Sequence, residues 1–161
     1  MTLTNVTKDA EARTMTLTAE FDATVERVWQ HYDDPRQLEK WWGPPTYPAT
    51  VVDHDLSVGG GVRYFMTGPE GDKACGYWQV LAVDAPNSLE WENGFATDSL
   101  EPDRSMPVMA MRMQLAAGST GGTVMTLVTT FASTENMDWC LQMGMEEGMS
   151  LAVGQCDHLL G

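Results

Sequence analysis

Apolar and polar residues alternate one by one from position 14 to position 21, which predicts a β-strand with one buried face. The apolar face carries Met15, Leu17, Ala19 and Phe21. Six later segments show strand patterns, at residues 47–56, 62–67, 74–84, 88–95, 109–115 and 125–131. Turns rich in glycine or proline separate them, and the longest predicted loop covers residues 96–107. Residues 1–13 are polar and of mixed charge, and we assign no regular element to them.

Two short helices are predicted between the first strand and the others. Four apolar side chains at a spacing of three and four residues form one stripe: Val25, Val28, Trp29 and Tyr32. Asp22 or Thr24 is suited to cap the helix that carries this stripe. The pair Asp34-Pro35 predicts an N-cap followed by proline at the first position of a second helix. The Gly-Pro-Pro run at residues 43–45 ends that helix.

From Ser133 onward the apolar spacing is helical and no proline interrupts it. We expect one long helix, capped by Ser133 or Thr134, that runs to about His158. The predicted order is therefore one strand, two short helices, six strands and one long helix. Helices collected on one side of a mainly antiparallel sheet define an α+β fold. The length of the chain fits a single domain over residues 1–161.

Composition and charge narrow the set of partners. Hydrophobic residues make up 43% of the chain and charged residues 20%, as in globular proteins. The net charge is −14, from 23 acidic and 9 basic residues, so the surface repels phosphate groups. We therefore expect neither nucleic acid nor a membrane as a partner. No run of about 18 apolar residues exists to span a bilayer. Residues 1–13 lack the apolar stretch of a secretory signal, so we expect a cytoplasmic protein.

The three cysteines, Cys75, Cys140 and Cys156, show no metal-binding spacing. On one straight helix, Cys140 and Cys156 would lie about 24 Å apart. A disulfide requires Cα atoms within roughly 7 Å. We therefore expect reduced, buried thiols.

Signals for catalysis are weak. The histidines at positions 31, 54 and 158 lie in different predicted elements, without the spacing of a metal site. No glycine-rich phosphate loop and no nucleophile elbow occurs. The run Asp53-His54-Asp55 contains acid–base groups, but neighbouring strand residues point to opposite faces, so we interpret it as a solvated strand end. We predict no catalytic residue, no metal and no cofactor.

Two segments carry a resemblance to a known superfamily. Residues 20–29 read Glu-Phe-Asp-Ala-Thr-Val-Glu-Arg-Val-Trp, and residues 38–44 read Leu-Glu-Lys-Trp-Trp-Gly-Pro. With further matches at residues 55–60, 80–86 and 122–127, the chain resembles the SRPBCC (START-like) superfamily. The branch that it resembles is named after the C-terminal domain of the heat-shock-protein-90 ATPase activator. The resemblance covers about residues 14–160.

This resemblance implies a helix-grip fold, in which a curved antiparallel sheet of about seven strands wraps around a long C-terminal helix. It also implies a deep cavity between sheet and helix that takes apolar or amphipathic small molecules. Relatives often carry an aromatic residue in the middle of the last helix, directly after a glycine. In this chain Gly148 is followed by Met149, which enlarges or softens the expected cavity wall.

Glycine and methionine are prominent in the predicted last helix. Gly144, Gly148 and Ala152 follow one another at four-residue spacing on one face, and each interior glycine costs about 1 kcal/mol relative to alanine. Close contact with the sheet and open volume for a ligand both explain such a face. The chain has 12 methionines, which line adaptable pockets or fill cores. Trp29, Trp41 and Trp42 are expected in the core or at the cavity rim.

Our first hypothesis is that the protein binds a small hydrophobic or amphipathic molecule in an internal cavity. The predicted lining combines strand and helix residues: Tyr64, Met66, Trp78, Trp91, Met111, Thr129, Met145 and Met149. Tyr64 and Thr129 would orient the ligand, and an indole N–H would offer a further polar contact. The alternatives are a co-chaperone-like interaction domain that acts on a heat-shock ATPase and a cyclase- or hydrolase-like enzyme. A monomer and a homodimer both remain open.

Overall fold

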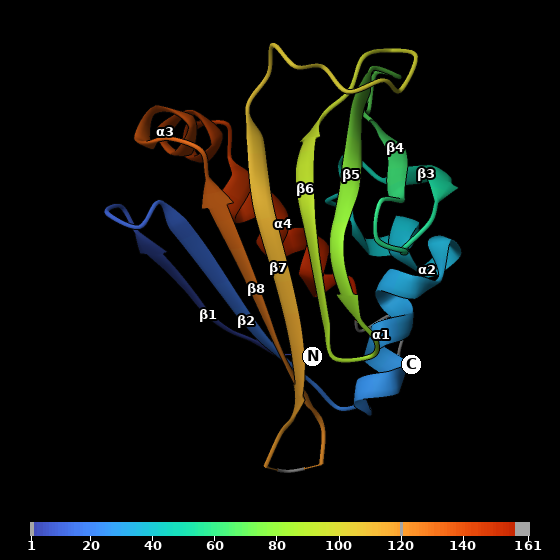
Figure 1. Cartoon of the computed structure of the whole chain (residues 1–161), viewed down its shortest axis with the longest axis vertical. Helices are drawn as coiled ribbons and strands as arrows, with labels where there is room; N and C mark the ends of the chain where they lie inside the picture. The colour runs from blue at the N-terminus through green and yellow to red at the C-terminus, as the bar shows by residue number, and fades with distance from the viewer. Residues whose placement is uncertain (1, 120, 157–161) are drawn as a thin grey trace.

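The computed structural model describes residues 2–119 and 121–156. Its strands form one eight-stranded antiparallel sheet in the order β1-β2-β8-β7-β6-β5-β4-β3 (Figure 1). The strands are β1 (Thr2–Asp9), β2 (Thr14–Phe21), β3 (Ala49–His54), β4 (Gly61–Thr67), β5 (Lys73–Asp84), β6 (Ser88–Phe95), β7 (Val108–Ala117) and β8 (Thr123–Phe131). The helices are α1 (Val25–Asp33), α2 (Pro35–Trp41), α3 (Thr134–Gln142) and α4 (Met145–Gly154). The predicted α+β fold is confirmed.

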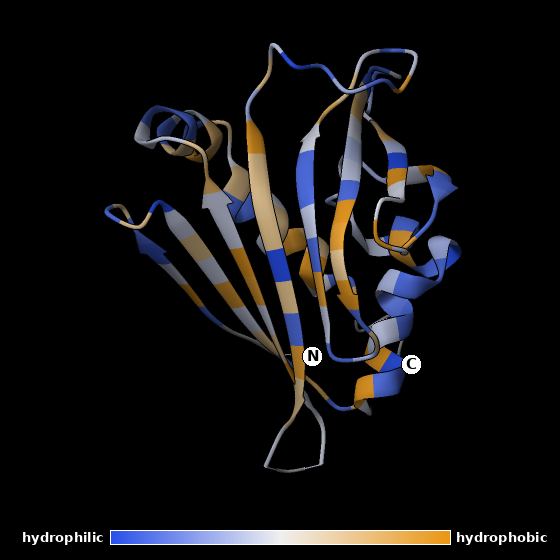
Figure 2. Ribbon diagram, in the orientation of Figure 1, coloured by the Kyte–Doolittle hydropathy of each residue, from blue (hydrophilic) through white to orange (hydrophobic). Residues whose placement is uncertain are grey.

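The helices lie on one side of the sheet. In Figure 1, α4 crosses behind β7 and β6, α2 lies next to β3, and α1 leads up to α2. The core fills the space between the sheet and the helices, because strand residues on that side are buried at every second position. In β8 the inward residues Met125, Leu127, Thr129 and Phe131 are all buried. Figure 2 shows the hydrophilic and hydrophobic bands along the strands that accompany this alternation.

Three helix starts agree with the capping residues that the sequence offers. The Thr24 side chain accepts a hydrogen bond from the Arg27 backbone N–H, so Thr24 caps α1. Asp34 caps α2 in the same way through the N–H of Arg36, with Pro35 at the first helical position. Ser133 caps α3. Each cap satisfies an N–H group that has no partner inside its helix.

The sheet contains one strand more than predicted. Residues 1–13 were expected to hold no regular element, but β1 pairs antiparallel with β2, with a bulge between Leu3 and Asn5. The side chains of Asn5, Thr7 and most of their neighbours are exposed. A strand at the edge of a sheet needs no buried face, because its backbone pairing with the neighbouring strand holds it in place. Its sequence therefore lacks the alternation that reveals the inner strands.

The expected single C-terminal helix is broken into α3 and α4. Gly144 lies between them with φ at +86°, a left-handed conformation that residues with a Cβ rarely adopt. Its N–H donates to the Leu141 carbonyl, and its own carbonyl accepts from the N–H of Gly148. The straight-helix separation expected for Cys140 and Cys156 does not apply to this geometry, although none of the three cysteines forms a disulfide within the described part of the chain. The predicted helix end at His158 lies outside the described residues.

Candidate functional site

A cavity of about 560 Å³ lies between the inner face of the sheet and the α3–α4 segment. This volume is within the range of pockets that hold small organic ligands, roughly 300–1,000 Å³. The sheet contributes mainly Tyr64, Met66, Asn93, Phe95, Met109 and Met111 to the wall. The helical segment contributes mainly Trp139, Cys140, Gly144, Met145, Gly148 and Met149. Most of the lining is therefore apolar.

The glycines of the last helix face open space. A Cβ atom added at Gly144 or at Gly148 would meet no atom within 4 Å, and both residues line the cavity. These two glycines therefore do not pack closely against the sheet, and the space beside them is open. Met145 and Met149 are half-buried beside them. Flexible thioether side chains next to an empty volume form a wall that can adapt to the shape of a guest.

Helix α4 is held at both ends while its glycine face stands away from the sheet. At its C-terminal end, the Gln155 side-chain amide donates to the carbonyls of Trp41 and Gly43, at 3.3 and 2.6 Å. At its N-terminal end, Glu146 forms an ion pair with Lys8 of β1 at 2.6 Å. These contacts tie α4 to the rest of the chain without filling the cavity.

Five of the eight predicted lining residues lie on the cavity wall: Tyr64, Met66, Met111, Met145 and Met149. Trp78, Trp91 and Thr129 do not line this cavity, and that part of the prediction is corrected. The Trp78 and Trp91 rings stack on each other with centroids 4.2 Å apart, and Tyr32 and Trp42 cover them. Thr129 in β8 pairs with Met111 in β7, and its hydroxyl donates to the Met111 sulfur at 3.1 Å.

Alternation along a strand shows which face of the sheet a side chain occupies, but it does not show which helix covers that face. For this reason the pattern could not separate cavity-lining residues from residues packed under a helix. Trp78 and Trp91 lie on the predicted face, but side chains from the α1–α2 region pack directly on them. The cavity opens only where the α3–α4 segment lies over the sheet.

Sequence reasoning missed Asn93, which lines the cavity and is only 9% exposed. A signal was present, because positions 89, 91, 93 and 95 alternate inward along β6 and Asn93 is the polar member of this series. A buried polar residue on an inner strand face needs a hydrogen-bond partner, and it often marks a functional position. Trp42, expected in the core or at the rim, also lies on the wall.

Trp42, Tyr64 and Asn93 form a polar group of side chains within the apolar wall. Burial raises the pKa of Tyr64 to about 12, although the nearby side chains of Trp42 and Asn93 favour the ionised phenol and oppose the shift. Tyr64 therefore stays protonated at neutral pH. The oxygen of the Asn93 side chain accepts from the Trp91 indole N–H at 3.3 Å. This bond leaves the Asn93 NH₂ group free to donate elsewhere.

The position of the Tyr64 ring depends on a glycine in the neighbouring strand. Tyr64 in β4 pairs with Gly76 in β5. A Cβ at Gly76 would collide with the Tyr64 phenol group. The Tyr64 ring therefore lies over Gly76, and a side chain at position 76 would displace it.

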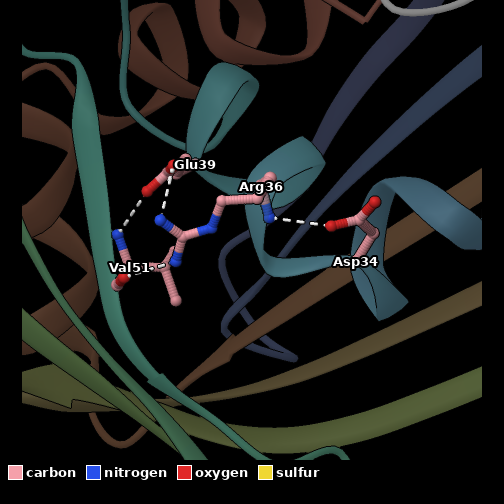
Figure 3. A network of polar contacts seen from close by, with 4 residues as sticks. All are labelled: Asp34, Arg36, Glu39 and Val51. Atoms are coloured by element: carbon pink, nitrogen blue, oxygen red, sulfur yellow. Dashed lines mark hydrogen bonds and ion pairs between the residues drawn. The ribbon is translucent and has the colours of Figure 1, made fainter.

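Trp42 is positioned by the way α2 attaches to the edge strand β3 (Figure 3). The Arg36 guanidinium donates to the Val51 carbonyl at 2.9 Å, and the Val51 N–H donates to the Glu39 carboxylate at 2.9 Å. Arg36 and Glu39 also form an ion pair at 3.1 Å. Together they satisfy both backbone groups of Val51 on the unpaired side of β3, which protects the sheet edge and fixes the helix that ends beside Trp42.

The acid–base groups of residues 53–55 do not line the cavity. The His54 ring forms a hydrogen bond to the Tyr32 carbonyl at 2.8 Å, while Asp53 and Asp55 are exposed. Within residues 2–119 and 121–156, no group of three or more His, Cys, Asp or Glu side chains is placed to hold a metal ion. In the same ranges, no helix has the length and apolar character needed to cross a bilayer.

Comparison with known proteins places the chain in a family. The model of the family described as "Activator of Hsp90 ATPase homolog 1-like protein" matches residues 22–161. The chain belongs to this family. Protein Ms6760 from Mycobacterium smegmatis is 50% identical; the match covers 99% of this chain and 98% of that chain, with a TM-score of 0.91.

Other solved structures share the fold of this chain. A protein from Arthrobacter aurescens, solved by NMR, is 47% identical over 97% of this chain and 90% of its own, with a TM-score of 0.91. DynU16, a putative protein of the dynemicin biosynthetic locus, shares the fold at 18% identity, with a TM-score of 0.63 and coverage of 92% of this chain and 47% of that chain. No functionally curated protein matches the chain significantly.

Proposed function

We propose that this protein binds a small hydrophobic or amphipathic molecule in the cavity between the sheet and the α3–α4 segment. The observation that carries the proposal is the glycine face of α4. Gly148 lies inside a helix, where it costs stability, and its missing side chain leaves open volume in a cavity of about 560 Å³. The helix-grip fold of the family, which typically takes hydrophobic ligands, supports the same conclusion.

The energy of binding would come from the apolar wall. Burial of apolar ligand surface contributes about 25 cal/mol per Å² before the costs of ordering the ligand and the protein. The half-buried Met145 and Met149 would reorient around the ligand, and Trp139 and Met143, which also line the cavity, are exposed to solvent. This arrangement suits a ligand with a compact apolar body.

Filling the cavity from the helix side tests the proposal. Gly148→Phe places a ring in the open volume, and because Gly148 is helical the substitution should not destabilise α4. The matched control is Leu151→Phe, which adds a ring to the same helix at a position that is 49% exposed and does not line the cavity. The probe is N-phenyl-1-naphthylamine, a neutral dye whose fluorescence rises in apolar surroundings.

We expect the unmodified protein and Leu151→Phe to bind the dye with equal affinity and Gly148→Phe to bind it at least about tenfold more weakly, a loss of about 1.4 kcal/mol. Native mass spectrometry of the purified protein provides a second measurement, because a co-purified small molecule should be absent from Gly148→Phe. Absence of dye uptake by the unmodified protein, or equal uptake by Gly148→Phe, would contradict the proposal.

A further inference from the structure

The polar groups on the cavity wall are mostly hydrogen-bond donors. The Trp42 indole can only donate, the Tyr64 hydroxyl can donate, and the Asn93 NH₂ group is left to donate because its oxygen is already bonded to Trp91. The acceptors within this group are the Tyr64 oxygen and the Asn93 side-chain oxygen, which already accepts from Trp91. The donors outnumber these acceptors, and the Trp42 indole N–H is left without a partner among the described residues.

The Trp42 indole N–H is a buried donor without an acceptor among the residues that the structure describes. Trp42 is only 9% exposed, and its Nε1–H has no hydrogen-bond partner in the described part of the chain. Edge contacts with Trp41, Tyr64 and Trp78, at centroid distances of 5.6, 6.2 and 4.9 Å, hold the ring in place. The indole therefore cannot turn toward solvent, and a buried donor without a partner is costly.

The Tyr64 hydroxyl, on the cavity wall, also lacks a hydrogen-bond acceptor within the described chain. The Tyr64 ring lies next to Trp42, with centroids 6.2 Å apart, and its hydroxyl proton needs an acceptor. Among the described residues no acceptor for this proton forms a hydrogen bond with it, and the Gly76 backbone beneath the ring prevents the ring from retreating. An acceptor supplied by a guest molecule would bond to Tyr64 and complete the group.

The wall also restricts the charge of the guest. Of the described residues that line the cavity, none is Lys, Arg or His. The single acid, Asp72, accepts from the Tyr47 hydroxyl at 2.9 Å. A buried carboxylate without a cation is expensive, and the net charge of −14 adds long-range repulsion. A neutral acceptor oxygen avoids both costs.

We infer, resting on the binding function proposed above, that the ligand is a neutral molecule with a carbonyl-type oxygen on an apolar body. The oxygen of a ketone, ester or amide would accept a hydrogen bond from the Tyr64 hydroxyl, next to Trp42 and Asn93. The apolar body would lie against the methionines and glycines of α4.

Three naphthalenes of similar size test this inference by isothermal titration calorimetry. 2-Acetylnaphthalene carries the neutral acceptor, 2-isopropenylnaphthalene replaces its oxygen with a CH₂ group, and 2-naphthoate carries a negative charge. We expect the unmodified protein to bind the acetyl compound about tenfold more tightly than the isopropenyl compound, the effect of one good hydrogen bond. Naphthoate should bind more weakly than the acetyl compound.

The variant Tyr64→Phe removes only the hydroxyl oxygen. We expect it to bind the acetyl and isopropenyl compounds within about twofold of each other, with unchanged affinity for the isopropenyl compound. The control is Tyr47→Phe, a tyrosine on the same wall whose hydroxyl already donates to Asp72, and it should keep the tenfold preference. The carbonyl infrared band of 2-acetylnaphthalene bound to the unmodified protein gives a measurement that needs no variant, and it should lie at lower frequency than in hexane.

Several results would overturn the inference. Equal binding of the acetyl and isopropenyl compounds would refute the acceptor and leave the binding function intact. Tightest binding of naphthoate would refute the neutral charge, and a preference that survives in Tyr64→Phe, or an unshifted carbonyl band, would refute the role of Tyr64. If none of the three compounds binds and the dye is also excluded, the binding function fails together with the inference.

Discussion

The inner face of the sheet has two halves that are covered in opposite ways. In the aromatic half, Tyr32 and Trp41 from α1 and α2 pack together with Trp78 and Trp91 of the sheet, and all four side chains are nearly fully buried. In the glycine–methionine half, Gly144, Met145, Gly148 and Met149 lie across the cavity from the strands. Trp42 stands at the boundary, since it packs on Trp78 and also lines the cavity.

This difference shows how one sheet can be a solid core and a binding site at the same time. Large planar side chains interlock and exclude space where two helices rest on the strands. Where the covering helix lacks side chains on its inner face, the same inner strand face becomes a cavity wall. The stability of the fold should therefore reside mainly in the aromatic half, and the capacity for ligands in the other half.

The largest expected effect is the difference in lost stability between two tryptophan variants, one in each half of the inner face. Trp41→Ala removes a side chain that is 1% exposed and donates to the His31 carbonyl at 2.9 Å, so unfolding should become easier by about 3–5 kcal/mol. Trp139→Ala removes a side chain that is 36% exposed and contacts Phe95, and it should cost about 1 kcal/mol. Chemical denaturation of both variants measures the two values. Equal losses would show that the halves do not differ in their contribution to stability.

A second effect, of about 2 kcal/mol, concerns pH. Burial of His31 in α1, with a smaller effect of the Arg27 charge, lowers its pKa from 6.5 to about 4. The unfolded chain thus binds a proton more readily than the folded one between these values, and stability should fall as the pH drops from 7 to 5. The expected loss from this group over that range is about 2 kcal/mol.

Urea denaturation at pH 7 and pH 5 tests this, with His31→Gln as the reference for all other titrating groups. The unmodified protein should lose about 2 kcal/mol more than the variant over the same range. The same pH dependence in both proteins would mean that the burial of His31 does not control acid stability.

The smallest effect compares the two glycines of the open half. Gly144→Ala should destabilise by about 1–2 kcal/mol, because its φ of +86° strains a residue with a Cβ. Gly148→Ala should stabilise by up to about 1 kcal/mol, because the residue is helical and the added methyl group enters open space. Thermal unfolding of both variants measures the signs. A loss of stability in Gly148→Ala would indicate that this face packs more closely than the structure describes.

Much of the fold could be predicted from the sequence because the inner strands carry a strict alternation. Segments such as 14–21 and 88–95 were predicted with the bounds of β2 and β6, and Thr24, Asp34 and Ser133 were among the expected caps. Strand β1 was not predicted, because an edge strand needs no buried face and so shows no alternation. The break between α3 and α4 was not predicted either, because the sequence does not show whether a glycine in a helical pattern adopts a negative or a positive φ.

The candidate site could be predicted only in part, for a related reason. Tyr64, Met66 and Met111 point inward by alternation, and Met145 and Met149 share a helix with the glycines, so their place on the wall follows from local patterns. Trp78, Trp91 and Thr129 obey the same alternation, and they are nevertheless buried without lining the cavity. Asn93 could have been recognised as a polar residue at an inward strand position. Polar residues are common along the chain, however, so this signal is weak.

What the sequence determined by itself was the set of elements and the face on which each apolar residue lies, because strand and helix periods are local properties of the chain. The tertiary structure decided where the inner face is filled and where it is hollow. That outcome depends on which helix rests on which strands, on the left-handed turn at Gly144, and on the contacts of Gln155 and Glu146 that tie the two ends of α4 to the rest of the chain. These contacts join residues far apart in the chain, so no local period records them.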